Sequence, residues 1–159
     1  EPGHMVVDPD GPPCPCGKRG CWERFASGPG LARMAGEAAR AGRLNAVLAL
    51  AGGNADAVRG EHVVAAARKG DAAAAELLTE LARWIALGLA NLANILDPAV
   101  IVIGGGLVEA ADLLLPAVRG HFLTLVMSVE RRAELPILPA ELGDRAGAIG
   151  AAMLAAKVA

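Results

Sequence analysis

A cluster of metal-ligand residue types near the N-terminus most constrains how this chain can fold. All three cysteines of the 159-residue chain lie close together, at Cys14, Cys16 and Cys21, and His4 precedes them. Three thiolates and an imidazole can complete a tetrahedral shell around Zn²⁺ without leaving an open position, which indicates a structural site. Glycines between Cys16 and Cys21 allow the tight turn that makes the sulfurs converge. The cluster therefore predicts a zinc-binding loop; the alternative is three buried or unpaired thiols.

Composition limits the class of protein. The length suits one domain with a sizeable core, and 54% of the residues are hydrophobic. The net charge of −2 gives no basic surface for a nucleic-acid partner. No uninterrupted apolar run reaches the roughly 18 residues of a membrane span. An odd, clustered set of cysteines is a poor disulfide framework, so we expect a reducing, cytoplasmic environment. The chain begins at Glu1 rather than Met, which we interpret as a fragment or a processed chain.

Periodicity and capping residues predict mainly helices. Apolar residues recur every three or four positions over 72–96, after a capping Asp71. Ser27 is a second candidate cap, and Pro116 predicts a break or kink within its helix. We expect only short helices and loops over 42–60. The predicted helices are 30–41, 61–69, 72–96, 108–125 and 145–158.

Three short β-favouring runs, at 5–8, 99–103 and 135–139, alternate with these helices and indicate an α/β fold. The run 99–103 is apolar without alternation, which is typical of a strand covered on both faces. The prolines of 135–139 favour a position near a sheet edge or at strand ends. Three strands are few for a covered sheet, so we expect further strands upstream of Glu1.

Two further groups of residues could contact a ligand. Glu1, His4 and Glu23 lie beside or within the metal loop, where they could hydrogen-bond to a polyhydroxylated molecule. Taken alone, Glu1 is better explained as a solvated terminal residue and Glu23 as a helix-start carboxylate. Gly104, Gly105 and Gly106 follow a strand and allow a phosphate or nucleotide to approach the backbone. They match neither dinucleotide-binding nor P-loop patterns, and a purely structural turn is an equal alternative.

An ordered series of motifs resembles the ROK family of sugar kinases and sugar-responsive repressors, and within it the bacterial ATP-dependent glucokinases. The series spans nearly the whole chain. It comprises Glu1-Pro2-Gly3-His4, then Cys14-x-Cys16-Gly17-x-x-Gly20-Cys21-x-Glu23, then Trp22 to Gly28, Asn91 to Pro98, Ile103-Gly104-Gly105-Gly106 and Gly147 to Ala152.

The resemblance implies an actin-like, ribonuclease H-like ATPase fold, of which 1–159 would be most of the larger, C-terminal lobe. Within it, 1–26 would be the zinc-binding region. It implies that His4, Cys14, Cys16 and Cys21 bind zinc. It also implies that Glu1, His4 and Glu23 contact the sugar and that Gly104, Gly105 and Gly106 lie beside the nucleotide. One imidazole could serve both metal and sugar through its two nitrogens.

The implied reaction transfers the γ-phosphoryl group of Mg-ATP to the 6-hydroxyl of glucose or a related hexose. The family's Asp-x-Gly-x-Thr phosphate loop and its catalytic aspartate have no counterpart in this sequence. We therefore expect them in an N-terminal lobe outside this chain, and expect no catalytic residue within it. The resemblance also implies a homo-oligomer, dimeric or tetrameric. The alternative function is the sugar-sensing domain of a ROK-type transcriptional repressor, whose nucleic-acid contacts would lie outside this chain.

Overall fold

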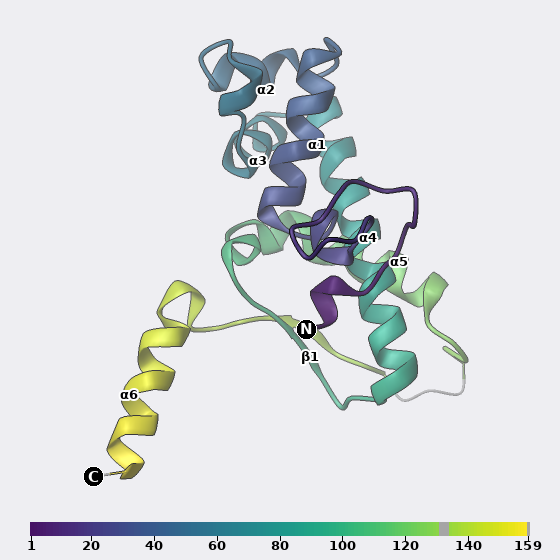
Figure 1. Cartoon of the computed structure of the whole chain (residues 1–159), viewed down its shortest axis with the longest axis vertical. Coiled ribbons are helices and arrows are strands. Elements are labelled where there is room, and N and C mark those ends of the chain that lie inside the picture. The colour runs from purple at the N-terminus through teal and green to yellow at the C-terminus, as the bar shows by residue number, and fades with distance from the viewer. Residues whose placement is uncertain (131–133, 159) are drawn as a thin grey trace.

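A long helix, α4 (Ala72–Leu96), runs through the molecule, and three other helices, α1, α3 and α5, pack along it (Figure 1). The structure, a computed structural model, describes residues 1–130 and 134–158. The remaining elements in chain order are η1 (Pro2–His4), η2 (Trp22–Arg24), α1 (Gly28–Arg40), α2 (Asn45–Leu50), η3 (Ala55–Ala57), α3 (Gly60–Arg68), β1 (Ile101–Ile103), η4 (Gly106–Ala110), α5 (Ala111–Leu125), β2 (Ile137–Pro139), η5 (Gly143–Arg145) and α6 (Ala146–Val158).

The predicted ends of α4 are confirmed, and side-chain chemistry explains them. Asp71 caps the helix, because its Oδ1 accepts a hydrogen bond of 2.8 Å from the Ala74 backbone N–H. At the other end Asp97 adopts a left-handed conformation with φ of 44°, and Pro98 cannot continue the helix. Ser27 caps α1 in the same way, accepting from the Gly30 N–H at 3.0 Å.

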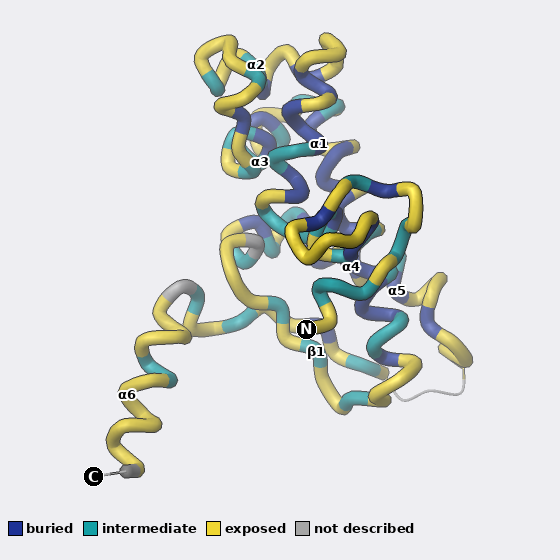
Figure 2. The backbone as a smooth tube through the Cα atoms, in the orientation of Figure 1, coloured by how far each residue is buried: buried dark blue, intermediate teal, exposed yellow. Residues whose placement is uncertain are grey.

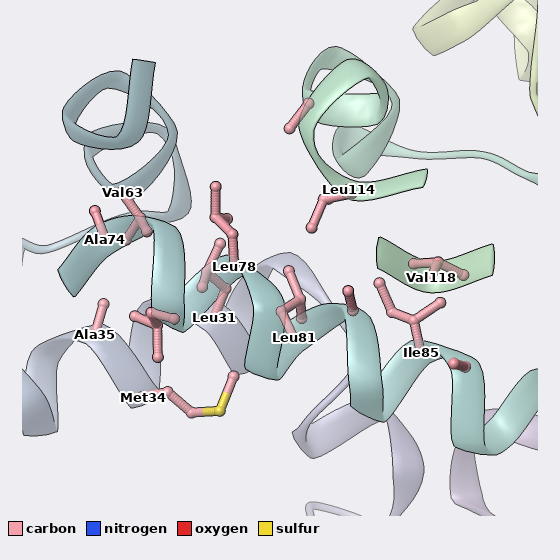
Figure 3. Packing of buried hydrophobic residues seen from close by; sticks show 14 of the residues in the cluster. Leu31, Met34, Ala35, Val63, Ala74, Leu78, Leu81, Ile85, Leu114 and Val118 are labelled. Atoms are coloured by element: carbon pink, nitrogen blue, oxygen red, sulfur yellow. The ribbon is translucent and has the colours of Figure 1, made fainter. Parts of the chain in front are cut away.

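The hydrophobic core surrounds α4. Figure 3 shows Leu31 and Met34 of α1 beside Leu78 and Leu81 of α4, and Val118 of α5 beside Ile85. Leu31, Leu81, Val63 and Val118 are at most 1% exposed, which fixes α1, α3 and α5 against α4. Burying each such side chain contributes about 1.5–3 kcal/mol. The helices are thus held by packing.

The sheet has two parallel strands among the described residues, with Ile101 opposite Ile137 and Ile103 opposite Pro139. Helix α5 supplies the crossover that a parallel pair needs. Val102 is 58% exposed and Leu138 45% exposed. The prediction that 99–103 is covered on both faces is therefore wrong for the described part of the chain, since one face of the strand is open.

The structure also lacks the strand predicted at 5–8 and the break predicted at Pro116. Residues 5–8 do not form a strand; they make only an isolated antiparallel bridge between Val6 and Cys21. The pairing stops because Val7 N–H and Asp8 N–H both donate to the Gly20 carbonyl, after which the chain turns. Helix α5 also continues through Pro116 without a break. Proline there removes one hydrogen bond early in the helix, and the buried Leu115 and Val118 hold the following turn.

Helix α6 stands away from the helical body (Figure 1), and Figure 2 colours it almost entirely as exposed. Met153 and Leu154 are 61% and 68% exposed. Among the described helices none combines the length and the apolar character needed to cross a bilayer.

Candidate metal centre and adjoining cleft

The four predicted metal ligands converge. One ligand atom each from His4, Cys14, Cys16 and Cys21 lies within 4.8 Å of all the others. His4 Nδ1 is 3.6 Å from Cys14 Sγ, and the Sγ atoms of Cys16 and Cys21 are 3.5 Å apart. Tetrahedral Zn²⁺ with ordinary bond lengths places two sulfurs about 3.8 Å apart and a nitrogen and a sulfur about 3.6 Å apart. The donor set and its spacing therefore fit a structural zinc ion.

The loop reaches this arrangement through backbone hydrogen bonds and glycines. Cys14 N–H donates to the Lys18 carbonyl at 2.8 Å, and Gly17 N–H donates back to the Cys14 carbonyl at 3.0 Å. Gly20 has φ of 63°, and a Cβ there would lie only 1.4 Å from the Asp8 carbonyl oxygen. No other residue fits at this position. The glycine spacing noted in the sequence is thus required by the fold of the loop.

The thiols differ in their electrostatic surroundings. Burial raises the pKa of the Cys21 thiol to about 12. The backbone N–H of Lys18 is the main cause of a lowered pKa at Cys16, which is exposed. A buried thiol with a raised pKa is protonated at neutral pH, and a divalent cation is the kind of group that displaces such a proton.

Aromatic residues anchor the metal loop to α4. The indole N–H of Trp22 donates to the Trp84 carbonyl at 2.7 Å. The Trp22 ring lies so close to Gly88 that a Cβ at Gly88 would be 1.9 Å from it. Phe25 stacks on Trp84 with ring centroids 4.2 Å apart. These contacts, which the sequence did not reveal, fix the loop on a rigid element of the core.

Both predicted carboxylates lie beside the metal cluster. His4 Nε2 is 3.4 Å from Glu1 Oε2, while the Nδ1 atom of the same ring faces Cys14. Glu23 reaches the same turn, since a Cβ on Gly3 would be 3.2 Å from Glu23 Oε2. Glu1 and Glu23 are both exposed, so their oxygens can accept hydrogen bonds from a ligand. The structure thus brings the three residues together at one edge of the loop.

The glycine turn lies at a separate cleft of about 580 Å³. Gly105 has φ of 76°, and Gly104, Gly105 and Gly106 are exposed. The cleft is lined on one side by the start of α1 and by α3, and on the other by η4 and α5. Of the three glycines that the sequence singled out, only Gly106 lines the cleft. The further lining residues are Gly28, Pro29, Leu31, Ala32, Arg59, Gly60, Glu61, Val64, Ala65, Arg68, Glu109, Ala110 and Leu114.

Comparison with known proteins gives the family. The model of the ROK family matches residues 1–158. The chain belongs to the ROK family. It is 41% identical to a glucokinase from Streptomyces coelicolor, over 96% of this chain and 49% of the relative. It also resembles the crystal structure of a ROK glucokinase from Streptomyces griseus in complex with glucose and AMPPNP, with a TM-score of 0.87, 42% identity, and coverage of 96% of this chain and 49% of that one.

A transcriptional regulator, NagC of Escherichia coli, is a more distant relative, 32% identical over 95% of this chain and 35% of its own length. The chain spans about half the length of the glucokinases that it matches. The mixed α/β architecture agrees with these ROK structures. The family assignment that the cysteine motif and the later glycine motifs suggested is therefore confirmed.

Proposed function

We propose that this chain is most of the larger, C-terminal lobe of a sugar kinase with an actin-like, ribonuclease H-like fold. The complete kinase transfers the γ-phosphoryl group of Mg-ATP to the 6-hydroxyl of glucose. The observation that carries the proposal is the placement of His4, whose two ring nitrogens face a metal-ligand cluster and a carboxylate. The glucokinase relatives support the choice of sugar and reaction.

Zinc has a structural role in this proposal. His4, Cys14, Cys16 and Cys21 hold the ion, which fixes a loop that is poor in apolar side chains of its own. Binding of the ion to the deprotonated cysteines contributes directly to the stability of the loop. With Nδ1 bound to zinc, the His4 ring would be held with Nε2 toward Glu1, as in the structure.

Sugar recognition is assigned to Glu1, His4 and Glu23. The carboxylates of Glu1 and Glu23 accept hydrogen bonds from the hydroxyls of a hexose, and such bonds are the stronger kind. With Nδ1 of His4 on the metal, its Nε2–H donates to a hydroxyl oxygen. Their contribution to the reaction is positioning, because a phosphoryl acceptor must be held in line with the ATP γ-phosphate. The base that receives the hydroxyl proton is expected in the other lobe of the complete enzyme.

Nucleotide binding is assigned to the cleft beside the glycine turn. Leu31, Ala32 and Val64 provide an apolar lining suited to a flat base, and Gly106 leaves the backbone open to phosphate groups. This assignment extends the expected nucleotide contacts from Gly104, Gly105 and Gly106 to both walls of the cleft. Partners are thus a hexose and ATP, and we retain a dimeric or tetrameric assembly and a cytoplasmic location as proposals.

Calorimetric titration with glucose tests the sugar assignment. Glu23→Gln keeps the size of the side chain but removes its charge, and we expect glucose affinity to fall about ten-fold or more, as for a lost charge-assisted hydrogen bond. Glu76→Gln changes an exposed acid on α4 and serves as the control. Equal affinity in both variants would contradict the role of Glu23.

The second candidate is the sugar-sensing domain of a transcriptional repressor, which the match to NagC favours. Both candidates bind sugar, so nucleotide binding separates them. Calorimetry with AMPPNP should detect binding if the chain belongs to a kinase. Sugar binding without any nucleotide binding would favour the repressor.

A further inference from the structure

One guanidinium group joins the two walls of the cleft. Arg68 is the last residue of α3, and its Nη2 donates to the backbone carbonyl of Glu109 in η4 at 3.0 Å. The same nitrogen donates to Asp112 Oδ1, in the first turn of α5, at 2.9 Å. Arg68 and Glu109 both line the cleft. A single side chain therefore connects the helix on one side with the glycine turn on the other.

The glycine turn has little internal support. Gly105 and Gly106 bear no side chain, and a Cβ on either would meet no atom within 4 Å. Val108 N–H donates a hydrogen bond of 3.0 Å to the Gly105 carbonyl. This is a 3₁₀-type bond, and its geometry is poorer than that of an α-helical hydrogen bond. The far end of η4 is anchored by Ala110, which is 3% exposed, so contacts that cross the cleft act on the part of the turn that precedes Ala110.

Asp112 supplies the side-chain acceptor in the connection between the two walls. It lies at the start of α5, where a carboxylate is favoured by the helix dipole, and it presents its oxygen to Arg68. The pair is solvent-exposed, with side-chain exposures of 50% for Arg68 and 63% for Asp112. Exposed pairs of this kind contribute little to global stability. Its removal should therefore change the cleft without unfolding the chain.

We propose that Arg68 is a positioning residue for the nucleotide, because its bonds to Glu109 and Asp112 set the distance between the glycine turn and α3. This inference rests on the proposed role of the cleft as the nucleotide site. Arg68 acts through the turn and need not touch the nucleotide. Without it, the turn can move away from α3, and nucleotide binding must then restore the closed arrangement at a cost in affinity.

The test is calorimetric titration of the zinc-loaded chain with AMPPNP. Arg68→Ala should raise the dissociation constant about five-fold, the factor that corresponds to the upper range for an exposed ion pair. Arg68→Lys keeps the charge and should recover part of the affinity. Arg40→Ala is the matched control, since Arg40 is 54% exposed and pairs with Asp56 away from the cleft. Zinc content and glucose affinity should stay unchanged in all three variants.

The outcomes separate this inference from the proposed function. If the unaltered chain does not bind AMPPNP, both the nucleotide assignment and the role of Arg68 are overturned. If the chain binds AMPPNP and Arg68→Ala binds it equally well, only the role of Arg68 is overturned. Loss of glucose affinity together with nucleotide affinity in Arg68→Ala would also overturn it. A double variant with Arg68→Ala and Asp112→Ala should bind AMPPNP as tightly as Arg68→Ala alone. If the losses of AMPPNP affinity from the two substitutions add up, the bond between Arg68 and Asp112 is not the cause.

Discussion

At the scale of single residues, Cys21 has the least room for change within the metal cluster. It is fully buried, and its Sγ lies 3.5 Å from that of Cys16. Cys21→Ser replaces a thiolate by a much weaker zinc ligand, so we expect zinc content to fall from about one ion per chain to less than a tenth. Elemental analysis of metal-loaded protein measures this. Chelation should lower the melting temperature of the unaltered chain but not that of the variant. Full zinc content in the variant would contradict the assignment.

Gly88 gives a second prediction at this scale. A methyl group there would overlap the Trp22 ring, which would be 1.9 Å away, so Gly88→Ala must displace the metal loop or bend α4. We expect a loss of about 1–3 kcal/mol in the free energy of unfolding. Gly120→Ala is the matched control, since nothing lies within 4 Å of the added carbon in α5. Alanine should stabilise that helix by about 0.5–1 kcal/mol. Urea unfolding of both variants measures the difference, and similar values for the two would refute the close contact.

At the scale of elements, the sequence predicts helices much better than strands. The ends of α4 follow from Asp71 and from Asp97-Pro98, which act within a few residues. The run at 5–8 has a suitable composition, but strand formation depends on a partner strand, and of the residues that the structure describes only Cys21 pairs with this run, in a single bridge to Val6. The exposure of Val102 likewise depends on what packs against the sheet. Contacts between residues far apart in the sequence cannot be read from a local pattern of residue types.

Helix α6 gives a prediction for a whole element. It packs against η5, and its residues as far as 157 are exposed except for the half-buried Ile149 and Gly150, so it adds almost nothing to the core of this chain. A chain ending at Arg145 should therefore melt within about 2 °C of the full 159-residue chain, since a change of 1 kcal/mol shifts the melting temperature by about 2–4 °C at this size. Thermal unfolding followed by circular dichroism checks this. A drop of about 5 °C or more would show that α6 supports the fold of this chain.

At the scale of the whole molecule, the convergence of His4, Cys14, Cys16 and Cys21 was predictable and the cleft was not. The ligands of the metal centre lie within one short stretch of the sequence, so their spacing carries the geometry. The cleft forms only when α3 and η4, far apart in sequence, pack on either side of it. The bond from Arg68 to the Glu109 carbonyl depends on that packing, and a main-chain acceptor leaves no mark on the sequence.

The division of the site between this chain and the rest of a ROK kinase leads to the last prediction. In the proposed function this chain supplies the sugar contacts of Glu1, His4 and Glu23 and one nucleotide cleft, whereas its sequence contains no Asp-x-Gly-x-Thr phosphate loop. Phosphoryl transfer depends almost entirely on positioning and charge neutralisation around the transferred group. A chain that makes only part of the contacts to sugar and nucleotide therefore cannot catalyse it. We expect the isolated 159-residue chain to bind glucose but to form no ADP above the rate without protein. A coupled ADP assay, with the Streptomyces coelicolor glucokinase as the positive control, measures this. Glucose-dependent turnover by the chain alone would mean that its own residues complete the catalytic site.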